Sequence, residues 1–217
     1  MKKYKALIMD FDLTIADTAD IISNALLITA REFGYEPGLE NMRRGIGCLP
    51  AVIFARYTGE TDEEKLKKME ARYYENSHLM NLHQTKFFPG VREGLEMIHK
   101  RGIKTAIYSQ KASDLMIPPL VKEGIAPFID EVIGINEVKR TKPNPEGIEL
   151  ICNRFGIKSA DVLYTGDALT DEQTAEAAGV DFAPLLCGVT PAESFNLSRA
   201  VGVYGDLYSL CLDMLKE

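Results

Sequence analysis

Two aspartates stand close together at the end of an apolar segment. The run KALIMDF, residues 5–11, is typical of a buried strand, and Asp10 and Asp12 lie at its carboxyl end. Side chains alternate between the two faces of a strand, so residues i and i+2 project the same way. Two like charges beside an apolar element are unfavourable unless a cation or a shared proton compensates them. The pair therefore indicates a site that binds a cation or transfers a proton.

Three further predicted strands are also followed by polar side chains. These are Ser109, Gln110 and Lys111 after strand 103–109, Lys139 and Lys142 after strand 130–135, and Asp167 and Asp171 after strand 161–166. In an open α/β sheet, ligands bind at the carboxyl ends of the strands. Carboxylates supply the hard oxygen ligands that suit Mg²⁺, while lysine, hydroxyl and backbone N–H groups suit a phosphate dianion. We expect a magnesium ion and a phosphate group here, with Lys111 and Lys139 solvated rather than catalytic.

Beyond residue 90, predicted helices alternate with these strands. Helices are expected at 91–101, 145–155 and 171–178, and a helix from Ser113 should break or kink at Pro118 and Pro119. The segments VDFAPLL, residues 180–186, and AVGVY, residues 200–204, are candidates for the last strands. Strands alternating with helices imply right-handed crossovers. The fold class expected is α/β, with a doubly wound parallel sheet.

The segment between the first strand and this alternating region is nearly all helical in pattern. Apolar spacing predicts a helix at 18–33, and Thr61 to Glu64 resembles a capping box that opens another helix. A loop rich in glycine and proline is expected between them. We therefore predict an α/β core formed by residues 1–15 and 86–217, interrupted by an inserted α-helical domain at 16–85.

Composition excludes several classes of partner. The chain has 217 residues and a net charge of −7, which argues against nucleic acid or an anionic membrane surface. No apolar run approaches the roughly 18–20 residues that a membrane span needs, and the one near the amino terminus is too short for a signal peptide. The four cysteines are scattered, as is typical of reduced thiols. A cytoplasmic protein is expected, and its oligomeric state is not predicted.

The strand-end motifs resemble those of the haloacid dehalogenase-like (HAD) hydrolase superfamily. DFDLT matches the first motif, Ser109 the second, Lys142 in KPNPE the third and GDALTD the fourth, in the family's order. The resemblance spans nearly the whole chain and implies a Rossmann-like HAD core. The helical insertion just after the first motif is similar to the C1-type helical cap of the phosphoglycolate phosphatase-like branch.

The resemblance also implies a role for each motif residue. Asp10 would be the nucleophile that becomes an aspartyl phosphate, and Asp12 would act as general acid and then as general base. Asp10, the backbone carbonyl of Asp12 and Asp167 would hold Mg²⁺, with Asp171 nearby or reaching the ion through water. Ser109 and Lys142 would bind the transferring phosphoryl group, and Lys142 would also offset the charge of the carboxylates.

Further residues are candidates for contact with the substrate. Gln110 stands where the family commonly has asparagine. Thr14 would either cap the turn after the first strand or assist Asp12. Arg43, Arg44 and Gly45 lie in the expected cap loop, where an arginine would bind a carboxylate or a second phosphate of the substrate. The alternative is that both arginines are solvated at a helix end.

One residue departs from the family pattern beside the proposed nucleophile. The family usually has glycine where this chain has Leu13. Leucine disfavours positive φ and adds bulk, so we expect a difference in the local turn or in its contact with the cap.

The presence of Asp12 distinguishes between reaction classes. Expulsion of a halide from carbon needs no proton donor, so a second acid at this position favours phosphoryl transfer over dehalogenation. The predicted function is a Mg²⁺-dependent phosphatase that hydrolyses a small phosphorylated metabolite through an aspartyl-phosphate intermediate. Two alternatives stay open, a β-phosphoglucomutase-like phosphotransferase and a catalytically silent phosphate-binding module. Phosphoglycolate, a sugar phosphate, a nucleotide and pyrophosphate all remain possible substrates.

Overall fold

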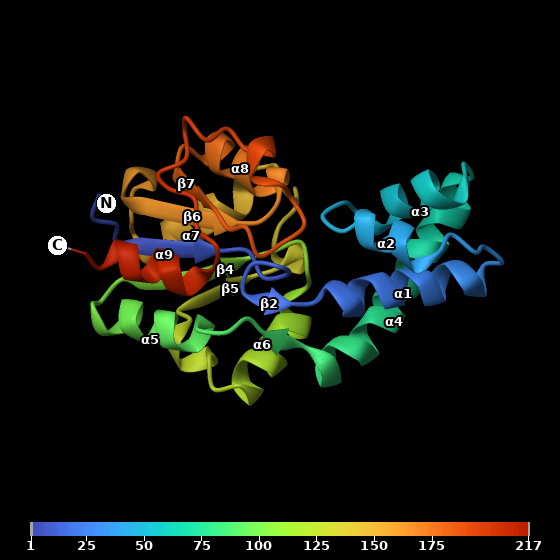
Figure 1. Ribbon diagram of the computed structural model, residues 1–217, viewed down its shortest axis with the longest axis horizontal. Helices are drawn as coiled ribbons and strands as arrows, with labels where there is room; N and C mark the ends of the chain where they lie inside the picture. Colours follow the sequence, from blue (N-terminus) through green and yellow to red (C-terminus); the bar gives the residue numbers. More distant parts are fainter. Residues whose placement is uncertain (1, 217) are drawn as a thin grey trace. The chain divides into compact units, whose positions relative to one another are not determined.

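The computed structural model describes residues 2–216, apart from the side chains of residues 79, 82 and 83, and it divides into two compact units (Figure 1). The core unit comprises Met1–Ala16 and Phe87–Glu217, and the helical unit comprises Asp17–Lys86. The chain passes between the units through two short strands, β2 (Ala16–Asp17) and β3 (Lys86–Phe87), which pair with each other.

A five-stranded parallel sheet forms the centre of the core unit, in the order β5-β4-β1-β6-β7. The strands are β1 (Ala6–Met9), β4 (Lys104–Tyr108), β5 (Glu131–Ile133), β6 (Val162–Gly166) and β7 (Asp181–Pro184). β1 is the central strand, because Ala6 is in register with Lys104 on one side and with Val162 on the other. Asp10, which directly follows β1, therefore lies at the carboxyl end of the central strand.

Alternate residues of each strand enter two separate apolar clusters, one on each face of the sheet. Leu7 and Met9 pack with α5, α6 and α9, while Ala6 and Ile8 pack with α7 and α8. The helices of this unit are α5 (Val91–Lys100), α6 (Ser113–Lys122), α7 (Glu146–Phe155), α8 (Leu169–Ala178) and α9 (Leu207–Met214). Short 3₁₀ helices occur at Ala126–Phe128, Ile135–Glu137, Ser159–Asp161 and Ala192–Ser194. Helices cover both faces, so the predicted doubly wound parallel sheet is confirmed.

The helical unit contains four helices around its own core. They are α1 (Ala19–Glu32), α2 (Leu39–Arg44), α3 (Pro50–Thr58) and α4 (Glu63–Gln84), and they bury Leu26, Met42, Phe54 and Met69 among other residues. The prediction of a loop between the two predicted helices is wrong, because α2 and α3 occupy much of that segment. Gly38 precedes α2 and Pro50 is the first residue of α3, so these residues mark helix starts.

Three details of the core unit differ from the sequence-based expectation. The α6 helix does not break at Pro118 and Pro119 but continues through both, since the fixed φ of proline is compatible with a helix. Burial of Leu115 and Met116 favours the helix despite the backbone hydrogen bonds that the prolines cannot donate. Residues 200–204 form a single bridge between Leu185 and Tyr204 rather than a strand. The α9 helix has no counterpart in the prediction. Among the described residues, no helix is long and apolar enough to cross a membrane.

Candidate active site

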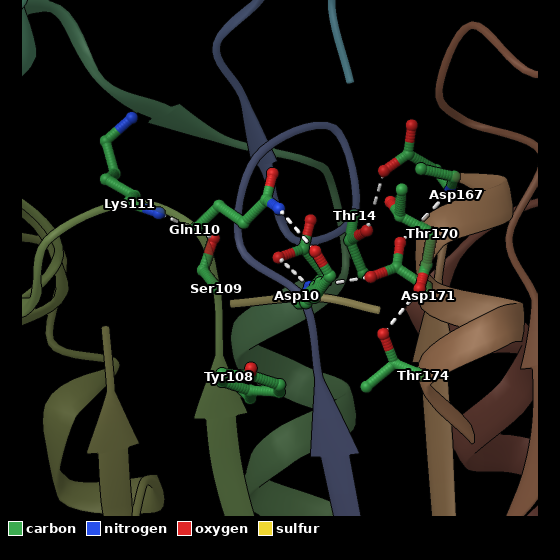
Figure 2. A network of polar contacts seen from close by, with 12 residues as sticks. Asp10, Thr14, Tyr108, Ser109, Gln110, Lys111, Asp167, Thr170, Asp171 and Thr174 are labelled. Carbon is green, nitrogen blue, oxygen red and sulfur yellow. Dashed lines mark hydrogen bonds and ion pairs between the residues drawn. The ribbon is translucent and has the colours of Figure 1, made fainter. Parts of the chain in front are cut away.

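The polar residues that follow four strands meet at one edge of the sheet, as the strand-end argument predicts. Asp10 follows β1, Ser109 follows β4, and Asp167 follows β6 (Figure 2). One carboxylate oxygen each from Asp10, Asp167 and Asp171 lies within 4.8 Å of the others. The described part of the chain thus contains a buried acidic triad at the carboxyl end of its central strands.

Lys142 is enclosed at the centre of this arrangement. Its Nζ lies 2.8 Å from Oδ1 of Asp10 and 2.6 Å from Oδ1 of Asp171, and its side chain is 2% exposed. The rings of Tyr108 and Tyr164 flank the ammonium group, with centroids 5.2 and 5.4 Å from Nζ. Two carboxylates and two aromatic faces therefore compensate the desolvation of one cation.

The second predicted motif lies beside Lys142. Ser109 is buried, and its Oγ accepts a hydrogen bond of 3.3 Å from the backbone N–H of Lys111. The side-chain amide of Gln110 donates to the backbone carbonyl of Lys142 at 3.2 Å. Gln110 therefore connects the loop after β4 to the lysine loop, a structural contact in addition to its predicted contact with substrate.

Thr14 and two glycines determine where the acidic side chains lie. The Thr14 hydroxyl donates to Oδ1 of Asp167 at 3.0 Å, a partner that neither predicted role for Thr14 includes. A Cβ added at Gly188 would lie 2.0 Å from Oδ2 of Asp167, and one at Gly166 would lie 2.3 Å from Oδ2 of Asp171. Both glycines therefore allow a carboxylate to pack directly against backbone. Gly188 follows β7 and was missed because no charged residue marks this strand end.

Lys111 is buried, so the expectation that it is solvated is wrong. The residue is 8% exposed, and its Nζ lies 2.7 Å from Oδ1 of Asp12 and 5.6 Å from the centroid of the Phe11 ring. A lysine looks the same in sequence whether it is solvated or paired. The sequence feature that indicates burial is its position two residues after Ser109, at the carboxyl end of a strand that contributes to the site.

The site contains more acidic than basic groups. Four carboxylates (Asp10, Asp12, Asp167 and Asp171) face two ammonium groups (Lys111 and Lys142), which leaves a formal charge of −2 when all are ionised. A divalent cation would neutralise this charge, and the oxygen ligands are those that Mg²⁺ prefers. The residues present therefore fit a divalent metal ion.

The pKa values of Asp10 and Asp167 reflect first their burial and then the excess of negative charge around them. Burial raises the pKa of Asp10 to about 6, with the charges of Asp171 and Asp12 adding to the rise and Lys142 opposing it. Burial, followed by the charges of Asp171 and Asp10, raises the pKa of Asp167 well above its ordinary value. Burial alone would lower the pKa of Lys142, but Asp10 and Asp171 outweigh it and raise that pKa.

Leu13 adopts the backbone conformation that its residue type disfavours. Its φ is 58°, in the left-handed region, and its N–H donates to the carbonyl of Ala16 at 2.8 Å. The side chain is 3% exposed. Left-handed backbone costs an L-residue roughly 1–2 kcal/mol, and burial of leucine offsets a similar amount. Leu13 therefore adopts a left-handed conformation of the kind that glycine favours. The expected difference in the local turn or in its contact with the cap stays a prediction.

The three candidates from the helical unit make contacts within that unit. Arg43 and Arg44 lie in the last turn of α2 rather than in a loop, and both are exposed. Arg43 pairs with Asp20, and Nε of Arg44 lies 3.3 Å from Oε1 of Glu40. Their contact with substrate stays a prediction.

Gly45, the third of these candidates, is buried and caps the end of α2. A Cβ added there would lie 2.7 Å from Cγ2 of Ile53. Its small size therefore permits close packing between α2 and α3.

Comparison with known proteins gives one family and several relatives. The model of the haloacid dehalogenase-like hydrolase family matches residues 7–185. A phosphoglycolate phosphatase from Nitrosospira multiformis is 33% identical over 181 residues, covering 81% of this chain and 80% of its own length. Pyrophosphatase PpaX from Halalkalibacterium halodurans is 27% identical, with coverage of 80% and 79%. A solved structure from Bacteroides fragilis, described as a haloacid dehalogenase-like hydrolase, is 30% identical with a TM-score of 0.90, and the match covers 96% of this chain and all of that one.

Proposed function

The chain belongs to the haloacid dehalogenase-like hydrolases, and from this premise we propose that it is a Mg²⁺-dependent phosphatase acting through an aspartyl phosphate on Asp10. The observation that carries the proposal is the contact of Asp10 with Lys142 inside the buried acidic triad. Its substrate would be a small phosphorylated metabolite of the cytoplasm.

Magnesium would be held by Asp10, the backbone carbonyl of Asp12 and Asp167, with Asp171 close by. When bound, the ion would supply positive charge to the phosphoryl oxygens, whose repulsion by a carboxylate nucleophile is the main obstacle to the reaction. The close approach of three carboxylate oxygens and the formal charge of −2 support this assignment.

The chain's own residues would carry out the reaction in two steps. The Asp10 carboxylate attacks phosphorus, and the bond from phosphorus to the leaving oxygen breaks while Asp12 donates a proton to that oxygen. Asp12 then accepts a proton from a water molecule that attacks the aspartyl phosphate, which releases phosphate and restores Asp10. Ser109 and Lys142 would hold the phosphoryl oxygens during both steps.

A panel of phosphate esters tests the proposal and begins to identify the substrate. We expect hydrolysis of p-nitrophenyl phosphate and of at least one of 2-phosphoglycolate, pyrophosphate, a sugar phosphate and a nucleotide. The first two natural compounds are chosen because relatives are named for them. Activity should disappear in EDTA and return with excess Mg²⁺. A long-lived acyl phosphate without hydrolysis would favour the phosphotransferase alternative, whereas neither turnover nor metal binding would leave the silent binding module.

Metal binding should stabilise the protein more at high pH than at low pH. The pKa of Asp10 is raised to about 6 in the folded state, so this carboxyl binds more protons in the folded protein than in the unfolded chain between about pH 4 and 6. Its protonation therefore stabilises the metal-free fold at low pH, and this contribution is lost as the pH rises through about 6. The raised pKa of Asp167 acts in the same direction. Magnesium must displace the Asp10 proton, so this group alone should lower the magnesium affinity by up to about tenfold per pH unit below about pH 6.

Thermal unfolding with and without magnesium measures this linkage. At about 100 times the dissociation constant, Mg²⁺ should raise the melting temperature by roughly 5 °C or more near pH 7.5 and by much less near pH 5. Asp167→Asn should reduce the shift at the higher pH. An equal shift at both pH values would contradict the assignment of these carboxylates as ligands.

A further inference from the structure

Lys111 is a buried cation to which the proposed reaction gives no role. Withdrawing an ammonium group from water costs several kcal/mol unless a partner compensates it. The structure supplies that partner as Asp12, whose Oδ1 lies 2.7 Å from Nζ, and the ring of Phe11 lies below the same group. The ion pair therefore connects the loop after β1 to the loop after β4.

The backbone of Lys111 is fixed by its neighbours. Its N–H donates to Oγ of Ser109, and its carbonyl accepts a hydrogen bond of 3.2 Å from the N–H of Ile135. Gly134 packs so closely that an added Cβ would lie 2.6 Å from the Lys111 carbonyl oxygen. The two neighbouring strand ends thus hold the main chain from which the lysine side chain extends toward Asp12.

Asp12 is the most open of the ion-paired carboxylates in the site. Its side chain is 21% exposed, compared with 12% for Asp10 and 1% for Asp171. Packing therefore limits the orientation of the Asp12 side chain less than that of Asp10 or Asp171. As the general acid, however, Asp12 would have to lie within hydrogen-bond distance of the leaving oxygen. We propose that Lys111 is a positioning residue that orients the Asp12 carboxylate for proton transfer. The inference rests on the proposed function, because it assumes that Asp12 is the general acid and base.

A positioning role predicts an effect that depends on the leaving group. Phenyl phosphate and p-nitrophenyl phosphate are similar in shape, but p-nitrophenolate is a stable anion that leaves with little help from an acid. With enzyme in excess, release of the phenol in the first turnover reports only the first step. Lys111→Met should slow this release by about tenfold or more for phenyl phosphate, and by less than about threefold for p-nitrophenyl phosphate.

Three variants and one further measurement separate orientation of Asp12 from other roles. Lys139→Met makes the same change at an exposed lysine and should leave both rates unchanged. Lys111→Arg keeps the charge and should retain most of the rate with phenyl phosphate. In an Asp12→Asn background, Lys111→Met should add no further selective loss, because the group that it orients is already absent. The Mg²⁺ concentration for half-maximal activity should be the same in wild type and Lys111→Met.

Each other outcome has a definite meaning. An equal loss on both substrates, or no loss, overturns the inference while leaving the proposed function intact. A raised half-saturating substrate concentration with an unchanged rate also overturns it, because Lys111 would then bind substrate. An inactive wild-type enzyme overturns the proposed function and the inference together.

Discussion

Asp10→Asn should lower turnover of p-nitrophenyl phosphate by roughly 10⁴-fold or more, because an amide cannot replace the carboxylate as the nucleophile. The change preserves the volume of a side chain that touches Lys142 at the centre of the site. Steady-state turnover with saturating Mg²⁺ measures the loss. Acid-quenched wild-type enzyme should also carry a phosphorylated peptide that includes residue 10, and the variant should not.

The stability of Asp10→Asn distinguishes lost chemistry from lost structure. Burial and neighbouring carboxylates make the Asp10 charge unfavourable, and its pKa is raised to about 6. A neutral amide removes this repulsion while Lys142 keeps Asp171, so the metal-free variant should melt at or slightly above the wild-type temperature near pH 7.5. Asp114→Asn, at an exposed position in α6, is the matched control and should retain activity. Activity within tenfold of wild type in Asp10→Asn would contradict an Asp10 nucleophile.

Lys142→Met should reduce both stability and activity. The change leaves Asp10 and Asp171 without the cation that compensates them, and breaking a buried ion pair costs about 3–5 kcal/mol. Loss of one preorganised charge at the phosphoryl group should lower kcat by roughly 10²–10³-fold. Urea unfolding of the metal-free protein and steady-state turnover measure the two effects. Excess Mg²⁺ should recover part of the stability, since it also supplies positive charge.

A double variant tests the electrostatic explanation for Lys142. Asp10→Asn combined with Lys142→Met removes one of the two carboxylates that Lys142→Met leaves uncompensated. The double variant should therefore be more stable than Lys142→Met alone, and by more than Asp10→Asn stabilises the wild-type protein, because the Asp10 charge is more unfavourable once Lys142 is absent. If the second change gives no recovery, the lysine stabilises the fold through packing against Tyr108 and Tyr164 rather than through charge.

Much of the core unit could be predicted because its strands are buried on both faces. Such strands appear as short apolar runs, and their carboxyl ends must meet at one edge of a parallel sheet. That rule alone brings Asp10, Ser109, Lys142 and Asp167 together, before any resemblance to a family is considered. The acidic triad follows from strand order and not from any local pattern.

The features that were missed depend on contacts that a local pattern does not contain. Glycine and proline in residues 34–60 suggest a loop, but Gly38 precedes the first residue of α2 and Pro50 is the first residue of α3. The α6 helix retains two prolines because tertiary burial outweighs local propensity. Lys111 and Leu13 are further cases, since only the neighbouring strands and the buried turn make a desolvated lysine and a left-handed leucine favourable.

The contacts that define the site join residues far apart along the chain. The partners of the Lys111–Asp12, Lys142–Asp10 and Thr14–Asp167 hydrogen bonds are separated by 99, 132 and 153 residues. The helical unit, by contrast, is one continuous segment with an apolar core of its own. Loops that must close over such lengths slow folding, because their entropy is lost before the contacts are gained. The site should therefore be among the last parts of the molecule to assemble during refolding, so that recovered activity reports completion of the whole core.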